Sequence, residues 1–360
     1  RQRQMCIRDR YIYMAIRTFY KVGNGLFVVE QSGNMVNIYD CGGQNKTIIQ
    51  DAVLRLKNNG ITHIDNLFIS HYDRDHVNGL WLLLSIFGCD RIFLPMVPPL
   101  VRVVDFAQHR YDSHYSDFIQ SPELFIREIG NNADIINVNE EEPAPENRDS
   151  VILTREKEDG TPGGFRQAPH EGGAREIANG SDCIAGHWMF RVFNRRVMSI
   201  QELSDFMHRL GLNVNATYDD IYKVLADQNI DLKKALRQVF SPQELNLIND
   251  YSMTVWSGST KTTDKGGCLF TGDYNAKSNM PQLSAVYKDL KPRTEIVQIP
   301  HHGSSYNFNL QLCDSSFKHI FSSSDAPYKS RRIVNPTDTI NLLKAKSFSY
   351  ATTFKNDIIV

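Results

Sequence analysis

Four residues of metal-binding type lie within six positions of this 360-residue chain: His71, Asp73, Asp75 and His76. Imidazole and carboxylate groups bind divalent metals without redox chemistry. The spacing His-x-Asp-x-Asp-His therefore offers ligands for a pair of metal ions. The alternative is a polar turn whose aspartates cap the helix that follows, with two incidental histidines.

Two further segments carry ligand-type residues, each at the end of a strand-like apolar run. Residues 268–271 precede a Gly-Asp pair that ends at Asp273, and residues 296–300 precede His301 and His302. Alone, Gly-Asp is an ordinary turn, and paired histidines are more often surface residues than ligands. Three such strand ends in one chain favour a shared site.

The elements around these residues are predicted from the periodicity of apolar side chains. The apolar run 64–69 reads as a strand and residues 77–84 read as a helix, so the first motif lies in a strand-to-helix turn. Residues 47–60 are predicted to form a helix that ends at Gly60. Alternation of strands and helices along the chain predicts an α/β fold.

With these motifs in this order, the sequence resembles the metallo-β-lactamase fold superfamily, and within it the ComEC-like hydrolase branch. Further segments that carry the resemblance are residues 22–29, 36–43, 249–255, 321–323, 335–337 and 356–360. The resemblance implies a four-layer αββα sandwich and a metal-dependent hydrolase. Unlike the membrane-embedded competence proteins of that branch, this protein is expected to be soluble.

The resemblance also implies which side chains form the site. The implied ligands of two divalent ions, zinc or manganese, are His71, Asp73, Asp75, His76, Asp273 and His302. Asp273 would bridge the two ions. The side chains with an implied catalytic role are Asp75, His301 and His302.

The chain departs from the superfamily pattern in three ways. Asp73 stands where most members have a histidine, which makes the site richer in oxygen ligands and favours manganese relative to zinc. The usual isolated histidine between the first motif and Gly-Asp has no secure match, and Asn335 replaces a histidine that often precedes the late proline.

Because side chains alternate in an extended segment, only one of His301 and His302 is expected to face the metals, with His302 preferred.

The expected function is hydrolysis by a hydroxide that two metal ions activate. A divalent ion lowers the pKa of bound water to roughly 7, and two ions about 3.5–4 Å apart can hold the attacking and leaving oxygens together. The expected substrate is a phosphodiester, which makes the protein a phosphodiesterase or nuclease. Two alternatives stay open: hydrolysis of a carboxylic ester, lactone or amide by the same hydroxide, and a non-catalytic binding module on the same fold.

Composition limits the partners and the compartment. The formal net charge is −1, so the chain lacks the basic balance of an avid, non-specific nucleic-acid binder, which weakens a nuclease reading without removing it. Six scattered cysteines without Cys-x-x-Cys spacing fit a reducing compartment. No long apolar run or signal peptide is found, so a cytoplasmic location without a membrane partner is expected.

The predicted organisation is one hydrolase domain over residues 11–360, with residues 1–10 outside the fold. Residues 140–182 are rich in glycine and acidic residues and are expected to form a mobile loop. Residues 199–248 read as a small helical insertion whose apolar stripes pack against the core. A substrate-selecting cap or a protein-docking surface is the alternative for this insertion.

Overall fold

The computed structural model describes residues 15–109, 113–140, 150–153, 174–196, 198–226, 232–241, 251–324 and 336–360. Several predicted features lie wholly or partly outside these ranges: residues 1–10, most of the 140–182 loop, the end of the helical insertion and Asn335. Among the described helices, none is long and apolar enough to cross a membrane.

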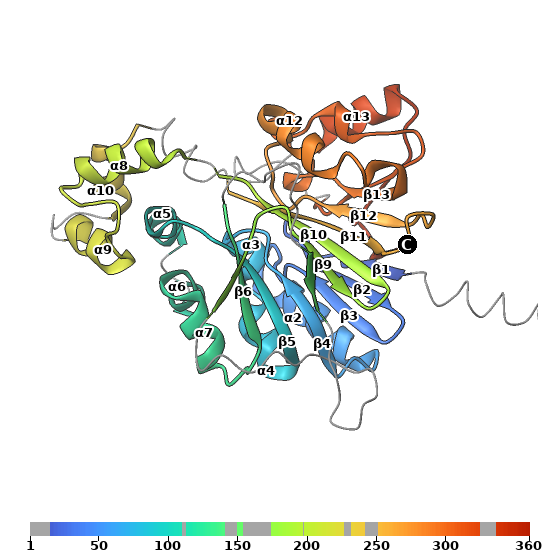
Figure 1. Ribbon diagram of the computed structural model, residues 1–360, viewed down its shortest axis with the longest axis horizontal. Helices are drawn as coiled ribbons and strands as arrows, with labels where there is room; N and C mark the ends of the chain where they lie inside the picture. The colour runs from blue at the N-terminus through green and yellow to red at the C-terminus, as the bar shows by residue number, and fades with distance from the viewer. Residues whose placement is uncertain are drawn as a thin grey trace, which may run out of the picture.

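Within the described ranges the strands form two facing sheets (Figure 1). The first sheet has the order β16 (Ile358–Ile359), β1 (Ala15–Phe19), β2 (Val28–Ser32), β3 (Met35–Tyr39), β4 (His63–Phe68), β5 (Gly88–Pro95), β6 (Asp134–Val138) and β8 (Arg175–Ile177). The second has the order β15 (Tyr350–Thr352), β14 (Lys318–Phe321), β13 (Thr294–Gln298), β12 (Gly267–Phe270), β11 (Met253–Ser259), β10 (Trp188–Asn194), β9 (Asp182–Ala185) and β7 (Ser150–Ile152).

Strand direction determines where the loops of the two sheets meet. Strands β3 to β6 run parallel to one another, and so do β12 to β15. In parallel strands the carboxyl ends lie at one edge, where sites of α/β proteins form. The predicted strands before His71, Asp273 and His301 are all present, as β4, β12 and β13.

Aromatic side chains fill the space between the sheets. Tyr39 of the first sheet stacks on Phe270 of the second with ring centroids 3.6 Å apart, and Phe68 lies 5.0 Å from Phe190. These side chains belong to one buried apolar cluster. Alternate residues of each strand face this layer, as expected of two packed sheets.

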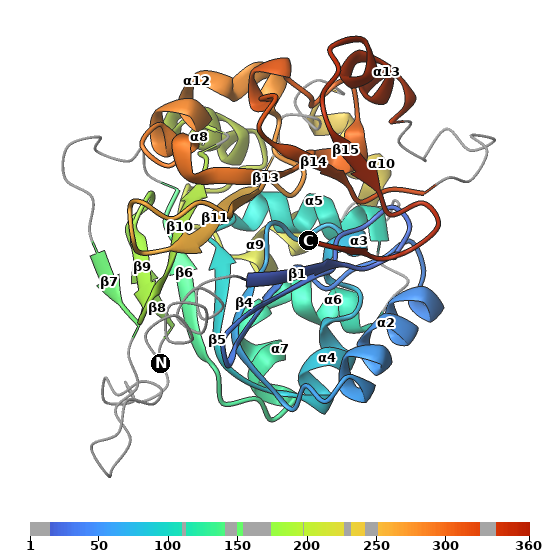
Figure 2. The ribbon, with the colours of Figure 1, turned by 90° about the vertical axis from the view of Figure 1, so that its right-hand side faces the viewer.

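Helices cover the outer faces of both sheets (Figure 2). On the first sheet they are α2 (Lys46–Asn58), α3 (Arg74–Val77), α4 (Leu80–Ile86), α5 (Pro99–His109), α6 (Ser113–Gln120) and α7 (Pro122–Glu128). On the second sheet they are α12 (Ala276–Tyr287) and α13 (Thr337–Ala345). The layers are therefore αββα, which confirms the predicted fold class, and α2 corresponds to the helix predicted over residues 47–60.

The described residues between β10 and β11 form three helices: α8 (Ile200–Arg209), α9 (Tyr218–Ala226) and α10 (Leu232–Val239). They stand together beside α5 (Figure 1). A capping box of Ser199 and Glu202 begins α8. Ile221 and Leu236 join the same buried cluster as Val104 of α5, so the apolar stripes pack against the main body.

The stretch predicted as a loop over residues 140–182 contains strands in its described parts. β7 pairs in parallel with β9 at one edge of the second sheet, and β8 pairs with β6 at one edge of the first. Edge strands present unpaired backbone groups, which short segments of almost any sequence can satisfy. The described parts of this stretch therefore include two edge strands, whereas most of the predicted loop lies outside the described residues.

Candidate metal centre

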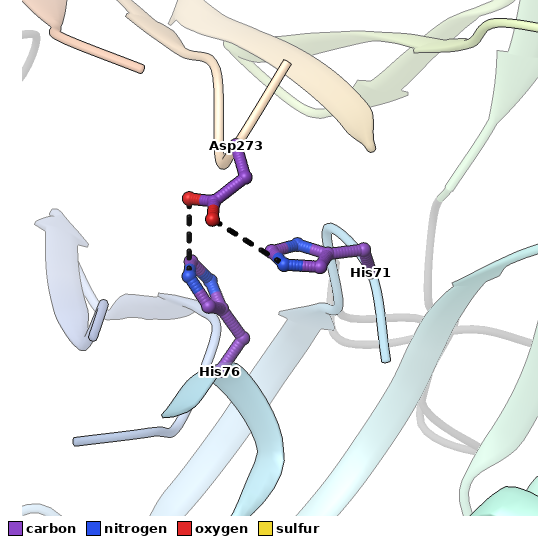
Figure 3. A group of neighbouring side chains, drawn as sticks. All are labelled: His71, His76 and Asp273. Atoms are coloured by element: carbon purple, nitrogen blue, oxygen red, sulfur yellow. Dashed lines mark ion pairs between the residues drawn. The ribbon is translucent and has the colours of Figure 1, made fainter. Parts of the chain in front are cut away.

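The metal motif and the downstream Gly-Asp turn meet at the carboxyl ends of β4 and β12. His76 Nε2 lies 3.2 Å from Asp273 Oδ1, and His71 Nε2 lies 3.7 Å from Asp273 Oδ2. Figure 3 shows both imidazole rings pointing at the two oxygens of this carboxylate. Residues almost two hundred positions apart in the sequence therefore share one site.

A second group of ligand atoms adjoins the first. His302 Nε2 lies 3.3 Å from Asp75 Oδ2 and 3.9 Å from Asp273 Oδ1. Two sets of three side chains have ligand atoms within 4.8 Å of one another: His71, His76 and Asp273, and Asp75, His76 and His302. His76 belongs to both sets, and Asp273 lies between them.

The buried polar atoms of this site test whether metal ions fit it. Among the described residues, Nδ1 of His301 has no hydrogen-bond partner, and neither do four atoms that lie close together: Nε2 of His71, His76 and His302, and Oδ1 of Asp273. Buried polar atoms are normally hydrogen-bonded, because an unpaired one costs free energy. All four converge on one place and are of kinds that bind divalent metals, so the donor set fits such ions.

Asp73 and His301 lie at the open side of the site. Asp73 Oδ2 is 3.8 Å from His71 Nε2, and 41% of its side chain is exposed. His301 Nε2 is 3.6 Å from Asp273 Oδ2, and 35% of its side chain is exposed. All seven side chains assigned to the site from the sequence are thus brought together, with these two at its border.

The backbone of His301 and His302 differs from the extended geometry assumed for it. Their φ angles are 47° and 55°, in the left-handed region. Each such residue costs roughly 1–2 kcal/mol, and strain of this kind concentrates at functional sites. Because the chain turns instead of extending, the two rings do not point to opposite sides. The His301 ring approaches Asp273 Oδ2, and the His302 ring approaches Asp273 Oδ1.

Backbone and side-chain bonds fix the orientation of His302. Its Nδ1 lies 2.9 Å from the backbone oxygen of Ser322, to which it donates when Nε2 carries no proton. Such a bond on the far nitrogen is typical of metal-binding histidines, because it selects the tautomer and holds the ring.

Asp40 is a site residue that the sequence reasoning missed. It is buried, and its Oδ2 lies 2.7 Å from His76 Nδ1 and 2.6 Å from the Ser70 hydroxyl. Its Oδ1 accepts from the Ser70 backbone N–H at 2.7 Å. The available signal was topological: β3 and β4 are neighbouring parallel strands, so Asp40 and Ser70 follow strand ends at the same edge.

Two glycines allow the loops to approach this closely. A Cβ at Gly42 would lie 2.1 Å from the backbone oxygen of Asp75, so the loop after β3 can touch the metal motif only with glycine there. Gly272 has φ +52°, and a Cβ there would lie 2.5 Å from Ser252 Oγ. That hydroxyl accepts from the Asp273 backbone N–H at 3.1 Å.

The electrostatics favour the protonation states that bind metal. Burial lowers the pKa of His71 to about 4, and the neighbouring His76 adds to the effect. Burial alone would raise the pKa of Asp273, but His301, His76 and His302 together hold it well below its usual range. A neutral imidazole and an ionised carboxylate are the forms that ligate divalent ions.

His76 behaves differently because carboxylates lie on both sides of its ring. Burial alone would lower the pKa of His76, but Asp273 and Asp40 raise it well above its usual value. A metal ion at Nε2 would therefore have to displace a proton from this ring.

Comparison with known proteins finds similarity in structure alone. No protein-family model and no curated protein sequence matches the chain. A metallo-β-lactamase fold protein, YhfI from Bacillus subtilis, is similar to it with 9% identity over 96% of this chain and 100% of that chain, at a TM-score of 0.40.

Two further solved structures are similar at the same level. The metallo-β-lactamase MIM-1 from Novosphingobium pentaromativorans has 10% identity over 93% of this chain and 90% of its own, at a TM-score of 0.31. A long form RNase Z from yeast has 9% identity over 86% of this chain and 37% of its own, at a TM-score of 0.36. These values are low, so the chemistry of the site has to be derived from its own residues.

Proposed function

We propose that this protein is a metal-dependent hydrolase whose substrate is a phosphodiester. Two divalent ions, manganese or zinc, would be held by His71, Asp73, Asp75, His76, Asp273 and His302. The observation that carries the proposal is the convergence of four buried ligand atoms without hydrogen-bond partners among the described residues, with the Asp273 carboxylate between two ligand groups.

The chemistry follows from the properties of the ions and of the chain. When bound, two divalent ions would supply hydroxide at neutral pH and offset negative charge on a phosphoryl oxygen. Asp75, with 37% of its side chain exposed, faces the open side. Burial alone would raise the pKa of Asp75, but His302 and His76 hold it below its usual value, so this carboxylate stays ionised and can orient water by accepting a hydrogen bond. His301 is the most exposed imidazole of the site and is placed to give a proton to the leaving oxygen.

Two features support the choice of metal and of substrate. Three carboxylates, those of Asp73, Asp75 and Asp273, make the site rich in hard oxygen ligands, which favours manganese over zinc. The motifs resemble those of the ComEC-like branch, which favours a phosphodiester over a carboxylic ester, lactone or amide. A non-catalytic binding module is disfavoured, because three buried imidazole nitrogens and one buried carboxylate oxygen without hydrogen-bond partners would destabilise it without an ion.

The proposed location is the cytoplasm. The five cysteines in the described part of the chain are all buried and unpaired: Cys41, Cys89, Cys183, Cys268 and Cys313. Free thiols persist in reducing compartments. Nucleic acid is the proposed partner, and a protein partner at the helical insertion is the alternative use of that element.

A substrate screen tests the proposed function. Purified protein with manganese or zinc would be offered single- and double-stranded DNA, RNA, cyclic dinucleotides, a chromogenic phosphodiester, a carboxylic ester and a lactone. Metal-dependent turnover of a phosphodiester that disappears in Asp273→Ala is expected. Turnover of the carboxylic substrates alone, or equal turnover in the variant, would contradict the proposal.

A further inference from the structure

An exposed aromatic ring stands next to the metal centre. Tyr306 is 82% exposed, four positions after His302. Its loop is compact, because the Ser304 backbone N–H donates to His301 O at 2.9 Å and the Asn307 backbone N–H donates to Ser304 O at 3.1 Å. The Asn307 side chain donates to the Asp273 backbone oxygen at 3.2 Å. The ring is thus held in the open by a loop that is tied to the site.

A lysine lies against this ring. Lys277 is exposed in the first turn of α12, four positions after Asp273, and its Nζ lies 6.0 Å from the centroid of the Tyr306 ring. Its backbone N–H donates to Asn307 O at 3.0 Å, and its Nζ donates to Ser305 O at 3.4 Å. An ammonium group and an aromatic face are therefore presented together at the rim.

Positive charge at the start of α12 comes from side chains rather than from free amides of the helix. The backbone N–H groups of Ser278 and Asn279 already donate to Asn275, at 3.2 and 3.1 Å. Arg195 places a second cation there, because its Nη1 donates to the Asn279 side chain at 2.9 Å. An anion beside Tyr306 would meet the charge of Lys277.

A groove that adjoins the metal motif at Tyr72 carries mostly negative charge. It has a volume of 920 Å³ and runs from Tyr72, beside His71, between α6, α7 and the start of α9. Its described lining includes one basic side chain, Arg102, and five acidic ones: Asp117, Glu123, Glu128, Glu140 and Asp219. A phosphate would be repelled in this groove and attracted at the α12 side, so an anionic substrate is directed to Tyr306 and Lys277.

We propose that Tyr306 and Lys277 form a nucleotide-binding subsite, in which the ring stacks on a base and the ammonium group pairs with a phosphate. The subsite rests on the proposed phosphodiester hydrolysis and narrows the substrate to phosphodiesters that carry a nucleoside. Since every base has a π face, stacking on Tyr306 selects nucleotides without selecting one base.

Binding without added metal tests the subsite independently of catalysis. Chelator-treated protein would be titrated with adenosine 5′-monophosphate, with a short single-stranded DNA and with inorganic phosphate. Tyr306→Ala should weaken binding of the mononucleotide about tenfold, and Tyr306→Phe, which keeps the ring, should not. Lys277→Met should weaken binding of all three, whereas Lys344→Met on the exposed face of α13 should weaken none. Wild-type affinity in Tyr306→Ala would overturn the subsite.

Kinetics separate a recognition role from a structural one. For a nucleotide aryl phosphodiester, Tyr306→Ala should raise KM about tenfold with a much smaller change in kcat. For a diester without a base, the increase in KM should be smaller. Equal losses on both substrates would overturn the subsite. Faster turnover of an oligonucleotide than of the aryl ester would identify a nucleic-acid strand as the source of the nucleotide. Faster turnover of the aryl ester would identify a small diester as the source.

The two proposals fail in distinguishable ways. If wild-type protein hydrolyses no phosphodiester with either metal, the proposed function is wrong, and the difference in binding between Tyr306→Ala and Tyr306→Phe still decides the subsite. If hydrolysis occurs but the two variants bind nucleotide alike, the subsite is wrong and the proposed function stands.

Discussion

His76 is held between two carboxylates, one at each ring nitrogen. Asp273 faces its Nε2 and Asp40 faces its Nδ1. A carboxylate behind a ligating histidine fixes its tautomer and raises its basicity. In the proposed metal centre, Asp40 is therefore a positioning residue, which would act on a bound metal through His76.

Asp40→Ala should reduce metal affinity by about 10–100-fold, because His76 loses the partner that orients it. Competition with a chelator of known affinity, at fixed pH, measures the change. The matched control is Asp51→Ala, which removes an exposed carboxylate on α2. Equal metal affinity in wild type and Asp40→Ala would contradict the role of Asp40.

His301→Ala and His302→Ala should differ. His302 is buried and belongs to a ligand group, so its loss should reduce bound metal. His301 is half-buried at the border, so its loss should lower kcat with a smaller loss of metal. Metal content and steady-state rates of both variants decide this, and equal losses of metal and of rate would refute the division of roles.

Contiguous ligands could be predicted from the sequence, but the environment of those ligands could not. His71 to His76 lie in one motif, and Asp273 follows a recognisable strand. Asp40 was not assigned to the site, because its role depends on the pairing of β3 with β4. The extended backbone assumed for His301 and His302 was wrong, because the sign of φ at non-glycine residues follows from tertiary contacts.

At the scale of elements, a buried polar network joins the two sheets. Glu30 on β2 is fully buried and accepts from Arg17 Nε at 2.6 Å and the Tyr39 hydroxyl at 3.1 Å, both in the first sheet. From the second sheet it accepts from Trp188 Nε1 at 3.1 Å and the Ser257 hydroxyl at 2.6 Å. A buried network in which the charges are paired and hydrogen-bonded fixes the relative position of the strands.

Glu30→Ala should lower the free energy of unfolding by about 3–5 kcal/mol, because it leaves the Arg17 guanidinium buried without its carboxylate. Chemical denaturation measures the loss. Asp357→Ala is the control, since it breaks an ion pair with Arg55 and a hydrogen bond from the Lys21 backbone N–H, both partly exposed to water. That control should lose about 1–2 kcal/mol. Similar losses in the two variants would contradict a special role for the network.

Long or strongly apolar elements were predicted well, and short edge elements were not. Helix α2 and strands β4, β12 and β13 follow clear apolar patterns, and the cap of α8 is Ser199, the first residue of the predicted helical insertion. Strands β7 and β8 have three residues each, and their pairing depends on the edge that they meet rather than on their own sequence.

At the scale of the whole molecule, the site is built from both sheets. Asp40 and the metal motif follow strands of the first sheet, whereas Asp273 and His302 follow strands of the second. These groups are far apart in an unfolded chain, so a metal ion binds the folded state far better than the unfolded one. Metal binding and stability are therefore linked.

Removal of metal should lower the melting temperature of the wild-type protein. At a free metal concentration of about 100 times the dissociation constant, the stabilisation is about 2.7 kcal/mol. Thermal unfolding with chelator and with excess manganese or zinc measures the shift. Asp273→Ala should show a much smaller shift, and a shift equal to that of the wild type would contradict the link.

The most direct test of the account is the number of divalent ions bound per chain. Elemental analysis after reconstitution with manganese or zinc, and after removal of free metal, should give two ions in the wild type and fewer in Asp273→Ala, because that carboxylate lies between both ligand groups. A wild-type protein without stoichiometric metal, or an Asp273→Ala variant with the same content as the wild type, would contradict the proposed metal centre.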